Sequence, residues 1–148
     1  DSGLEVAALG GMPGIHSARF TPTECVGVTP PGAAPGARGA PGDAHRRSLF
    51  LNALRGKPRP WLARFHCTLA IALPGGEMFF SQGEVEGEII PQERGQGGFG
   101  YDPIFLISDL GSTMAQLAPE KKNRISHRAR ALQAALPQLR QLLRAEEK

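Results

Sequence analysis

The sequence has few of the residues that form covalent or metal-held scaffolds. Its 148 residues include only two cysteines, one tryptophan and one tyrosine. The surroundings of Cys25 and Cys67 suggest neither a disulfide nor a metal knuckle, so we expect a reducing, cytoplasmic compartment. No apolar run approaches the length of a membrane span, and the first residues lack the basic and apolar regions of a signal peptide. We therefore expect no contact with a membrane.

The composition that is present is that of an ordinary globular chain. Hydrophobic residues make up 41% and charged residues 21%, and the length suffices for one domain with one core. The net charge of +3 is unevenly distributed, because residues 118–148 carry eight Lys or Arg against three Glu. A basic segment of this kind suits phosphate groups of a nucleotide or of nucleic acid. The alternative, which we prefer for most of these residues, is a solvated helix face.

One segment interrupts an otherwise patterned chain. Residues 21–42 are dense in proline, glycine and alanine. Such a composition cannot bury enough apolar surface to order itself. We therefore interpret residues 1–148 as one domain, with 21–42 as a mobile surface loop inserted into it.

The remaining patterns predict an α/β chain. Side chains alternate between apolar and polar from Arg64 to Leu73, and after a Pro-Gly-Gly turn a second strand runs from Glu77 to Ile90, so the pair predicts an antiparallel hairpin. Residues 43–55 predict a helix capped by Asp43. From Pro119 onward, apolar residues recur at three- and four-residue steps, which predicts an amphipathic helix that Pro137 kinks or splits. The apolar positions of that helix are Ile125, Ala129, Leu132, Leu136, Leu139 and Leu143.

The stretch GQGGFGYDPIF, residues 95–105, fits the pattern G-x-G-x-x-G. A dinucleotide-binding turn requires a helix directly after the glycines, and Pro103 prevents one because it moves Asp102 away from helical dihedral angles. Residues 104–107 instead predict a short buried strand. A glycine-rich connection between two strands accounts for the glycines, but it leaves Phe99, Tyr101 and Asp102 unexplained.

Two charged segments each allow two interpretations. Glu84, Glu86 and Glu88 share one face of a strand, where three carboxylates either hold a metal or form a solvated face, and we favour the solvated face. In EKKNRISHRAR, residues 120–130, Lys122 and Ser126 share a helix face. Lys122 is a compact charge that suits a phosphate. His127 can donate to a base carbonyl, and Arg128 offers a planar fork of donors. The alternative is again a basic, solvated helix.

Six stretches, including the two just described, follow one another along the chain: DSGLEV, GGMPGIHSARF, ARFHC, GEVEGEI, GGFGYDPIF and EKKNRISHRARAL. Together they closely resemble the inosine triphosphate pyrophosphatase family, over nearly the whole chain except the Pro/Gly-rich segment. The resemblance implies a mixed α/β fold with a long central β-sheet, flanking helices and a cleft between two lobes. It implies hydrolysis of ITP, dITP and XTP to the monophosphate and pyrophosphate, with Mg²⁺ as cofactor and a homodimer as assembly. No specific nucleic acid partner is expected.

The resemblance also implies roles for individual residues. Asp1 matches a general base that also binds the metal. The implied substrate-binding residues are Ser2, Phe99, Gly100, Tyr101, Asp102, Lys122, His127 and Arg128. Of these, His127 and Arg128 would recognise the 6-keto purine, and an aromatic face of the F-G-Y-D segment would stack on the base.

The chain departs from the family pattern in several places. Family members have several dozen residues before the D-S-G motif, including a T-G-N-x-x-K segment and a metal-binding glutamate, so we expect a chain lacking its N-terminal portion. Arg46 and Arg47 replace an asparagine-containing pattern, and Ala118 stands where a helix-capping Ser or Thr is usual. Two other interpretations stay open: an inactive fragment that keeps a purine pocket, and a basic nucleic-acid-binding module.

Overall fold

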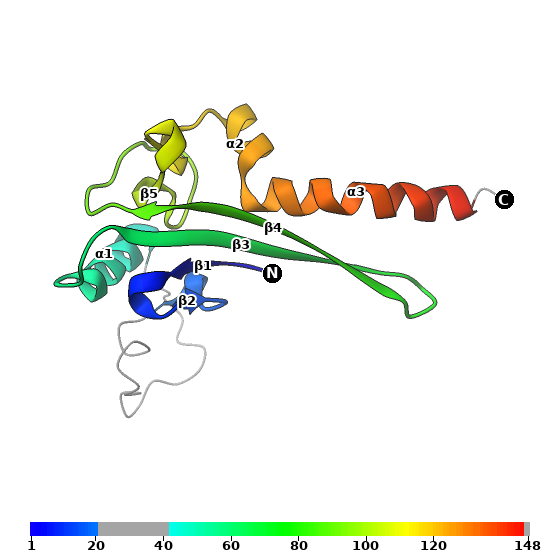
Figure 1. Ribbon diagram of the computed structural model, residues 1–148, viewed down its shortest axis with the longest axis horizontal. Helices are drawn as coiled ribbons and strands as arrows, with labels where there is room; N and C mark the ends of the chain where they lie inside the picture. The colour runs from blue at the N-terminus through cyan, green and yellow to red at the C-terminus, as the bar shows by residue number, and fades with distance from the viewer. Residues whose placement is uncertain (21–41, 147–148) are drawn as a thin grey trace, which may run out of the picture.

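A six-stranded sheet organises the chain in the computed structural model, which describes residues 1–20 and 42–146 (Figure 1). The predicted loop at 21–42 therefore lies, except for Gly42, outside the described residues. The strand order is β2-β1-β3-β4-β5-β6, and every pairing is antiparallel. The strands are β1 (Ser2–Val6), β2 (Pro13–Gly14), β3 (Trp61–Ala72), β4 (Met78–Ile89), β5 (Phe105–Ile107) and β6 (Ser112–Thr113). The α-helices are α1 (Asp43–Leu54), α2 (Pro119–Ile125) and α3 (His127–Glu146).

The long hairpin of β3 and β4 is the centre of the sheet, as predicted. Its register runs from Trp61 opposite Ile89 to Ala72 opposite Met78. Successive side chains of a strand point to opposite faces, so the alternation in the sequence places one set of residues in the core. Trp61, Ala63 and Phe65 are buried on that face. The helices α1 and α3 both lie beside the hairpin in space, α1 at one end and α3 along the other half (Figure 1).

The opposite face of the hairpin is charged. Arg64 donates to the carboxylate of Glu5 at 2.6 Å and lies 3.4 Å from that of Glu84, and Arg59 lies 3.5 Å from Glu88. Ion pairs between half-exposed side chains fit the solvated face that the alternating glutamates predicted. Among the described residues, no group of three or more His, Cys, Asp or Glu side chains is arranged to hold a metal.

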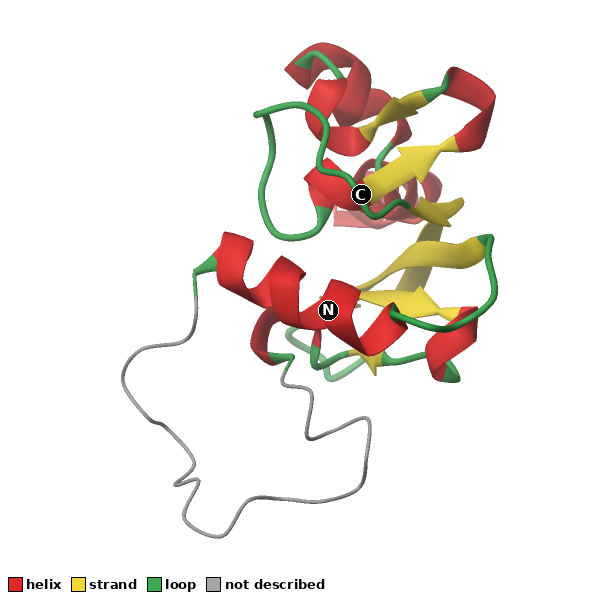
Figure 2. Ribbon diagram, turned by 90° about the vertical axis from the view of Figure 1, so that its left-hand side faces the viewer, coloured by secondary structure: helices red, strands yellow, loops and turns green. Residues whose placement is uncertain are grey.

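Helix α1 lies in front of the sheet at the end of the molecule seen in Figure 2. Phe50 and Leu54 are fully buried, and the Phe50 ring packs edge-on against that of Tyr101 at 4.9 Å. The predicted cap is wrong: Gly42 occupies the N-cap, and Asp43 is the first helical residue. Its side chain is therefore free to reach another segment of the chain.

The C-terminal helical region differs from the prediction in two ways. The helix is interrupted at Ser126, which adopts an extended conformation, while α3 continues unbroken through Pro137. The stripe that faces the sheet contains Ala131 and Ala135, whereas Leu132, Leu136 and Leu143 are exposed. Small residues occupy the buried stripe because α3 lies very close to β4. No described helix combines the length and apolar character that crossing a membrane requires.

Gly83 of β4 is the point of closest approach between the hairpin and α3. A Cβ atom at this position would lie 2.2 Å from the backbone nitrogen of Ala131 and 2.2 Å from the backbone oxygen of His127. Backbone atoms of a helix cannot move aside as a flexible side chain can, so only glycine fits.

Replacing this glycine with alanine should therefore force α3 away from β4. We expect Gly83→Ala to lower the free energy of unfolding by roughly 2–3 kcal/mol, the upper part of the range for overpacking. Gly75→Ala is the matched control, because the space around Gly75 in the hairpin turn is open, and it should change stability by less than about 0.5 kcal/mol. Urea unfolding of both variants measures the difference, and equal stabilities would contradict the close contact.

Candidate functional site

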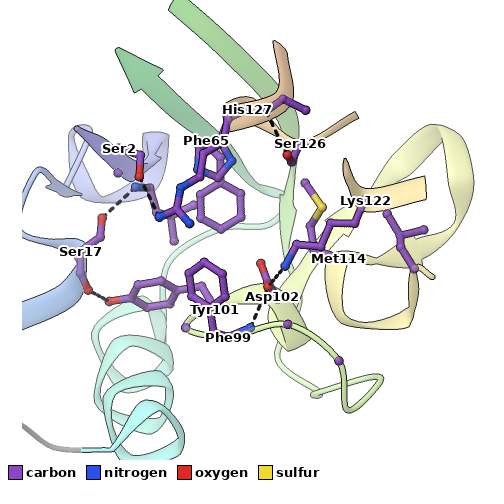
Figure 3. A pocket seen from close by; sticks show the side chains of 18 of the residues that line it. Ser2, Ser17, Phe65, Phe99, Tyr101, Asp102, Met114, Lys122, Ser126 and His127 are labelled. Carbon is purple, nitrogen blue, oxygen red and sulfur yellow. Dashed lines mark hydrogen bonds and ion pairs between the residues drawn. The ribbon is translucent and has the colours of Figure 1, made fainter. Parts of the chain in front are cut away.

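One cavity of about 920 Å³ lies between the N-terminal elements and the segment from residue 97 to the start of α3. β1 and α1 contribute one wall, and the glycine-rich loop, α2 and α3 contribute the other, with Phe65 of β3 between them (Figure 3). All eight residues predicted to bind substrate line this cavity: Ser2, Phe99, Gly100, Tyr101, Asp102, Lys122, His127 and Arg128. A cavity of this size accommodates a small molecule such as a nucleotide.

A buried ion pair holds the glycine-rich loop at the cavity wall. The Asp102 side chain is only 7% exposed, and its carboxylate pairs with the ammonium group of Lys122 on α2. It also accepts a hydrogen bond from the backbone N–H of Phe99 at 2.9 Å. Gly98 passes beside this pair with a φ of +74°, and a Cβ atom there would lie 2.1 Å from the carboxylate. The glycine thus leaves room for the charges.

Phe99 presents an aromatic face to the cavity. Its side chain is 56% exposed, and two cations lie near the ring, with the Lys122 ammonium 4.9 Å and the Arg128 guanidinium 5.0 Å from the ring centroid. Cation–π attraction keeps the ring and both charges together in the free protein. The aromatic face of Phe99 is therefore held in place at the cavity.

Tyr101 has a different environment from Phe99. It is buried, and its hydroxyl donates to the backbone carbonyl of Ser17 at 2.9 Å. The Ser17 hydroxyl in turn accepts a hydrogen bond from the N–H of Leu4 in β1 at 2.7 Å. Tyr101 therefore connects the loop to the strand that carries the D-S-G motif. Of the two aromatic residues in the loop, Phe99 is the one with an accessible face.

The break at Ser126 places His127 and Arg128 at the N-terminal end of α3, beside the cavity. The His127 ring stacks on Phe65, with 4.8 Å between the centroids and an interplanar angle of 13°. Burial lowers the pKa of His127 to about 4, and the neighbouring Arg128 contributes further. The ring is therefore neutral at physiological pH. Its Nδ1 atom is buried and has no hydrogen-bond partner within residues 1–20 and 42–146.

The D-S-G motif lies at the opposite edge of the cavity. The Arg128 guanidinium donates to the Ser2 hydroxyl at 3.2 Å, which joins the start of α3 to β1. Asp1 is exposed and is not among the lining residues, and its carboxylate accepts the backbone N–H of Ser2 at 2.7 Å. The catalytic and metal-binding roles of Asp1 stay predictions, as do the binding roles of the eight lining residues.

Sequence reasoning did not find the contribution of α1. Asp43 and Arg46 line the cavity, and Asp43 accepts the backbone N–H of Gly100 at 2.7 Å. This hydrogen bond is the largest cause of a lowered pKa for Asp43, and the adjacent arginines act in the same direction. The residue was visible in the sequence only as a possible helix cap, because a partner 57 positions away leaves no local pattern.

An antiparallel sheet with helices on its core face and a cleft-like cavity beside them defines an α/β protein with room for a small molecule. Comparison with known proteins gives the family: the model of the Ham1 family matches residues 1–138, and the chain belongs to that family. The resemblance predicted from the six motifs is thereby confirmed.

Two curated relatives and one solved structure show how close the likeness is. The dITP/XTP pyrophosphatase of Geobacillus kaustophilus is 45% identical over 133 residues, which cover 89% of this chain and 57% of the relative. The dITP/XTP pyrophosphatase of Listeria monocytogenes is 47% identical, with coverages of 89% and 58%. The chain thus spans about three fifths of the length of these relatives. The Ham1 protein of Staphylococcus aureus has a TM-score of 0.75 and 37% identity, covering 100% of this chain and 66% of its own, which confirms the predicted fold class.

The neutral state of His127 gives stability a specific pH dependence. The folded pKa of about 4 lies below the ordinary value of 6.5. As the pH falls from 6.5 towards 4, the unfolded chain takes up a proton that the folded chain does not, so stability present above pH 6.5 is lost. We expect His127→Gln to lose less stability than the parent between pH 7.5 and 5.

Two measurements check this expectation. Unfolding by urea at both pH values gives the stability difference, and NMR titration of the His127 ring gives its midpoint directly. The midpoint should lie near 4 in the parent and should rise in Arg128→Ala, because that variant removes a neighbouring positive charge. A parent midpoint near 6.5 would show that the ring is not shielded from water.

Proposed function

We propose that this chain forms the base-recognition side of an enzyme that hydrolyses non-standard purine nucleoside triphosphates, namely ITP, dITP and XTP, to the monophosphate and pyrophosphate. Family membership and relatives named dITP/XTP pyrophosphatases support the proposal. The observation that carries it is the cavity itself. The cavity brings Ser2, Phe99 and Lys122 together with the other predicted substrate-binding residues, although these three come from separate parts of the chain.

The proposed base site combines an aromatic ring that stacks on the purine with side chains that donate hydrogen bonds to its keto oxygen. The exposed face of Phe99 can stack on a purine, which contributes roughly 1–3 kcal/mol per base. A 6-keto purine presents a carbonyl oxygen, and both a neutral histidine and an arginine fork can donate to it. His127 supports this role because its pKa of about 4 keeps the ring neutral and its Nδ1 lacks a partner among the described residues. Asp102 supplies an acceptor beside them, and Lys122 a charge suited to a phosphate.

The proposed reaction takes place at the Asp1 edge of the cavity. A water molecule loses a proton to the Asp1 carboxylate and its oxygen forms a bond to the α-phosphorus. The bond between the α-phosphorus and its bridging oxygen breaks, and pyrophosphate leaves with the electron pair. Ser2, which is fixed by Arg128 at 3.2 Å, orients the nucleotide beside this carboxylate.

The donor set present in the chain is compatible with Mg²⁺. Asp1 is exposed and uses one oxygen for the N–H of Ser2, which leaves the other available. Mg²⁺ usually binds through one or two carboxylates together with substrate phosphates and water, so a single aspartate fits a metal that the triphosphate helps to hold. When bound, the metal offsets the charge of the triphosphate.

We further propose a cytoplasmic homodimer. Exposed apolar side chains supply surface for the association of two copies. They are Leu132, Leu136 and Leu143 on α3, and Met78 and Phe80 near the hairpin tip. The ion pairs of Arg59 and Arg64 on the other half of the hairpin suit contact with water.

Base choice provides the first test of this function. A pocket that donates to a 6-keto oxygen leaves donors unpaired against the 6-amino group of ATP, and an unsatisfied buried group costs about 1–3 kcal/mol. We therefore expect ITP and XTP to bind about tenfold or more tightly than ATP in calorimetric titrations.

Two variants make the base test specific. Arg128→Ala should narrow the preference for ITP, whereas Arg140→Ala, an exposed arginine further along α3, should leave it unchanged. Equal affinities for ITP and ATP in the parent would rule out base recognition. If single-stranded RNA displaced ITP and bound more tightly, the nucleic-acid-binding interpretation would be favoured.

Product identity tests the reaction. With ITP and Mg²⁺, we expect IMP and pyrophosphate in chromatography, and removal of the metal with a chelator should stop their release. Asp1→Asn should lower the rate about 100-fold or more, the usual contribution of a general base, while Asp109→Asn, an exposed surface aspartate, should retain the parent rate. Release of IDP and phosphate would contradict attack at the α-phosphorus. Binding of ITP without any product would support the inactive pocket instead.

A further inference from the structure

Arg47 of α1 is a buried arginine with two partners on different segments. Its Nε and Nη2 atoms donate to the two carboxylate oxygens of Glu93, at 2.8 and 3.0 Å. Its Nη1 atom donates to the backbone carbonyl of Gly100 at 2.7 Å. The planar guanidinium can bind a carboxylate through two parallel hydrogen bonds and still direct a third donor elsewhere. Arg47 thus joins both ends of the segment that links β4 to the cavity.

Asp43, one helical turn before Arg47, holds the other backbone polar group of Gly100. Its carboxylate accepts the backbone N–H of Gly100 at 2.7 Å. Residues four apart lie on the same helix face, so the two side chains reach Gly100 together. Both backbone groups of Gly100, the N–H and the carbonyl, are therefore bound by α1.

The segment that these bonds hold is otherwise open to water. Residues 91–99 are all exposed, up to and including Phe99. On its cavity side, two hydrogen bonds hold the loop. The N–H of Phe99 donates to the Asp102 carboxylate, and the N–H of Gly97 donates to the carbonyl of Ala115 at 3.0 Å. Arg94 is held as well, since its N–H donates to the carbonyl of Pro103 at 2.9 Å and its carbonyl accepts from the Thr113 hydroxyl at 2.6 Å. The bonds from α1 add an anchor at Gly100, the end of the segment next to Phe99. An exposed segment without such anchors moves readily.

We propose that Arg47 and Asp43 are positioning residues that fix Gly100 and thereby hold Phe99 in the orientation in which it receives the base. The proposal rests on the proposed nucleotide site. It gives α1 a function in recognition, although neither Arg47 nor Glu93 lines the cavity. The position of Phe99 follows from that of Gly100, because Asp43 binds the peptide that joins the two residues and Arg47 binds the next peptide along the chain.

Amide exchange of Gly100 and nucleotide affinity together test the proposal. Arg47→Met removes the fork while keeping the length of the side chain, and Glu93, which is 45% exposed, is then left in contact with water instead of being buried unpaired. We expect the Gly100 amide to exchange about tenfold or more faster in the free protein, and ITP to bind about tenfold more weakly. The preference for ITP over ATP should not change, because His127 and Arg128 are untouched.

Two further variants separate positioning from charge and from general stability. Arg47→Lys keeps the positive charge but cannot bridge Glu93 and Gly100, so it should behave like Arg47→Met. Arg55→Met removes an exposed arginine directly after the same helix and should match the parent in both measurements. Exchange of core amides in the β3–β4 hairpin is measured in the same samples, because a loss of global stability accelerates exchange there as well, whereas a loss of positioning accelerates exchange at Gly100 alone. If Arg47→Met does not fold, Asp43→Ala is measured in its place.

The outcomes distinguish this inference from the proposed function. If the parent binds ITP but Arg47→Met shows the parent's exchange rate at Gly100, or the parent's affinity, the positioning role is overturned and the nucleotide site stands. Recovery of both quantities in Arg47→Lys would likewise overturn it, because charge alone would then suffice. If the parent does not bind ITP, the proposed function fails, and with it the role in base binding, whatever the exchange rate shows.

Discussion

The burial of one carboxylate, Asp102, constrains the arrangement of the whole site. A charge that is removed from water must be paired, and breaking such a pair by removing one partner is strongly destabilising. Here the partner is Lys122, so α2 must approach the glycine-rich loop. The same carboxylate accepts the N–H of Phe99, which sets the path of the loop over the pair. Glycine at position 98 then follows from the lack of space beside the charges.

The cavity depends on this pair in combination with three other contacts between distant segments. Tyr101 connects the loop to Ser17 and so to β1, and Gly83 brings α3 against the hairpin. The stacked rings of Phe65 and His127 then form the surface between the two walls. Each contact joins elements that the sheet alone would leave separate. The site is therefore a property of the tertiary packing of loops and helices on one face of an ordinary antiparallel sheet.

The elements that sequence reasoning predicted correctly are those with a local pattern. Strict alternation from Arg64 to Leu73 identified the hairpin, because period-two burial is visible in the residues themselves. The break at Ser126 had no such signal. Pro137 was the expected point of interruption, yet it lies on an exposed face, where the carbonyl of Gln133 that loses its helical partner also belongs to an exposed residue and can bind water. A split of the helix at Pro137 therefore did not occur.

The candidate site likewise combines residues that the sequence identified with residues that left no signal in it. The motif residues could be predicted to act together because a family resemblance orders them along the chain. The side chains that hold them could not: Asp43 was interpreted as a cap, and Arg47 as a departure from the family pattern. Their partner, Gly100, lies more than 50 residues away and contributes only backbone atoms. No pattern in side-chain identity marks a hydrogen bond to a backbone group.

The contact between Ser2 and Arg128 has a consequence for how the chain acquires its site. The two residues are 126 positions apart, so the cavity closes only after β1 and the start of α3 have been brought together. Contacts of such separation form late, because the entropy of closing a long loop has to be overcome before the contact contributes any stability. During synthesis, the cavity-lining residues of α3 emerge after the other segments that line the cavity. A ligand of this cavity therefore binds the finished fold and not its intermediates, and it shifts the folding equilibrium towards completion.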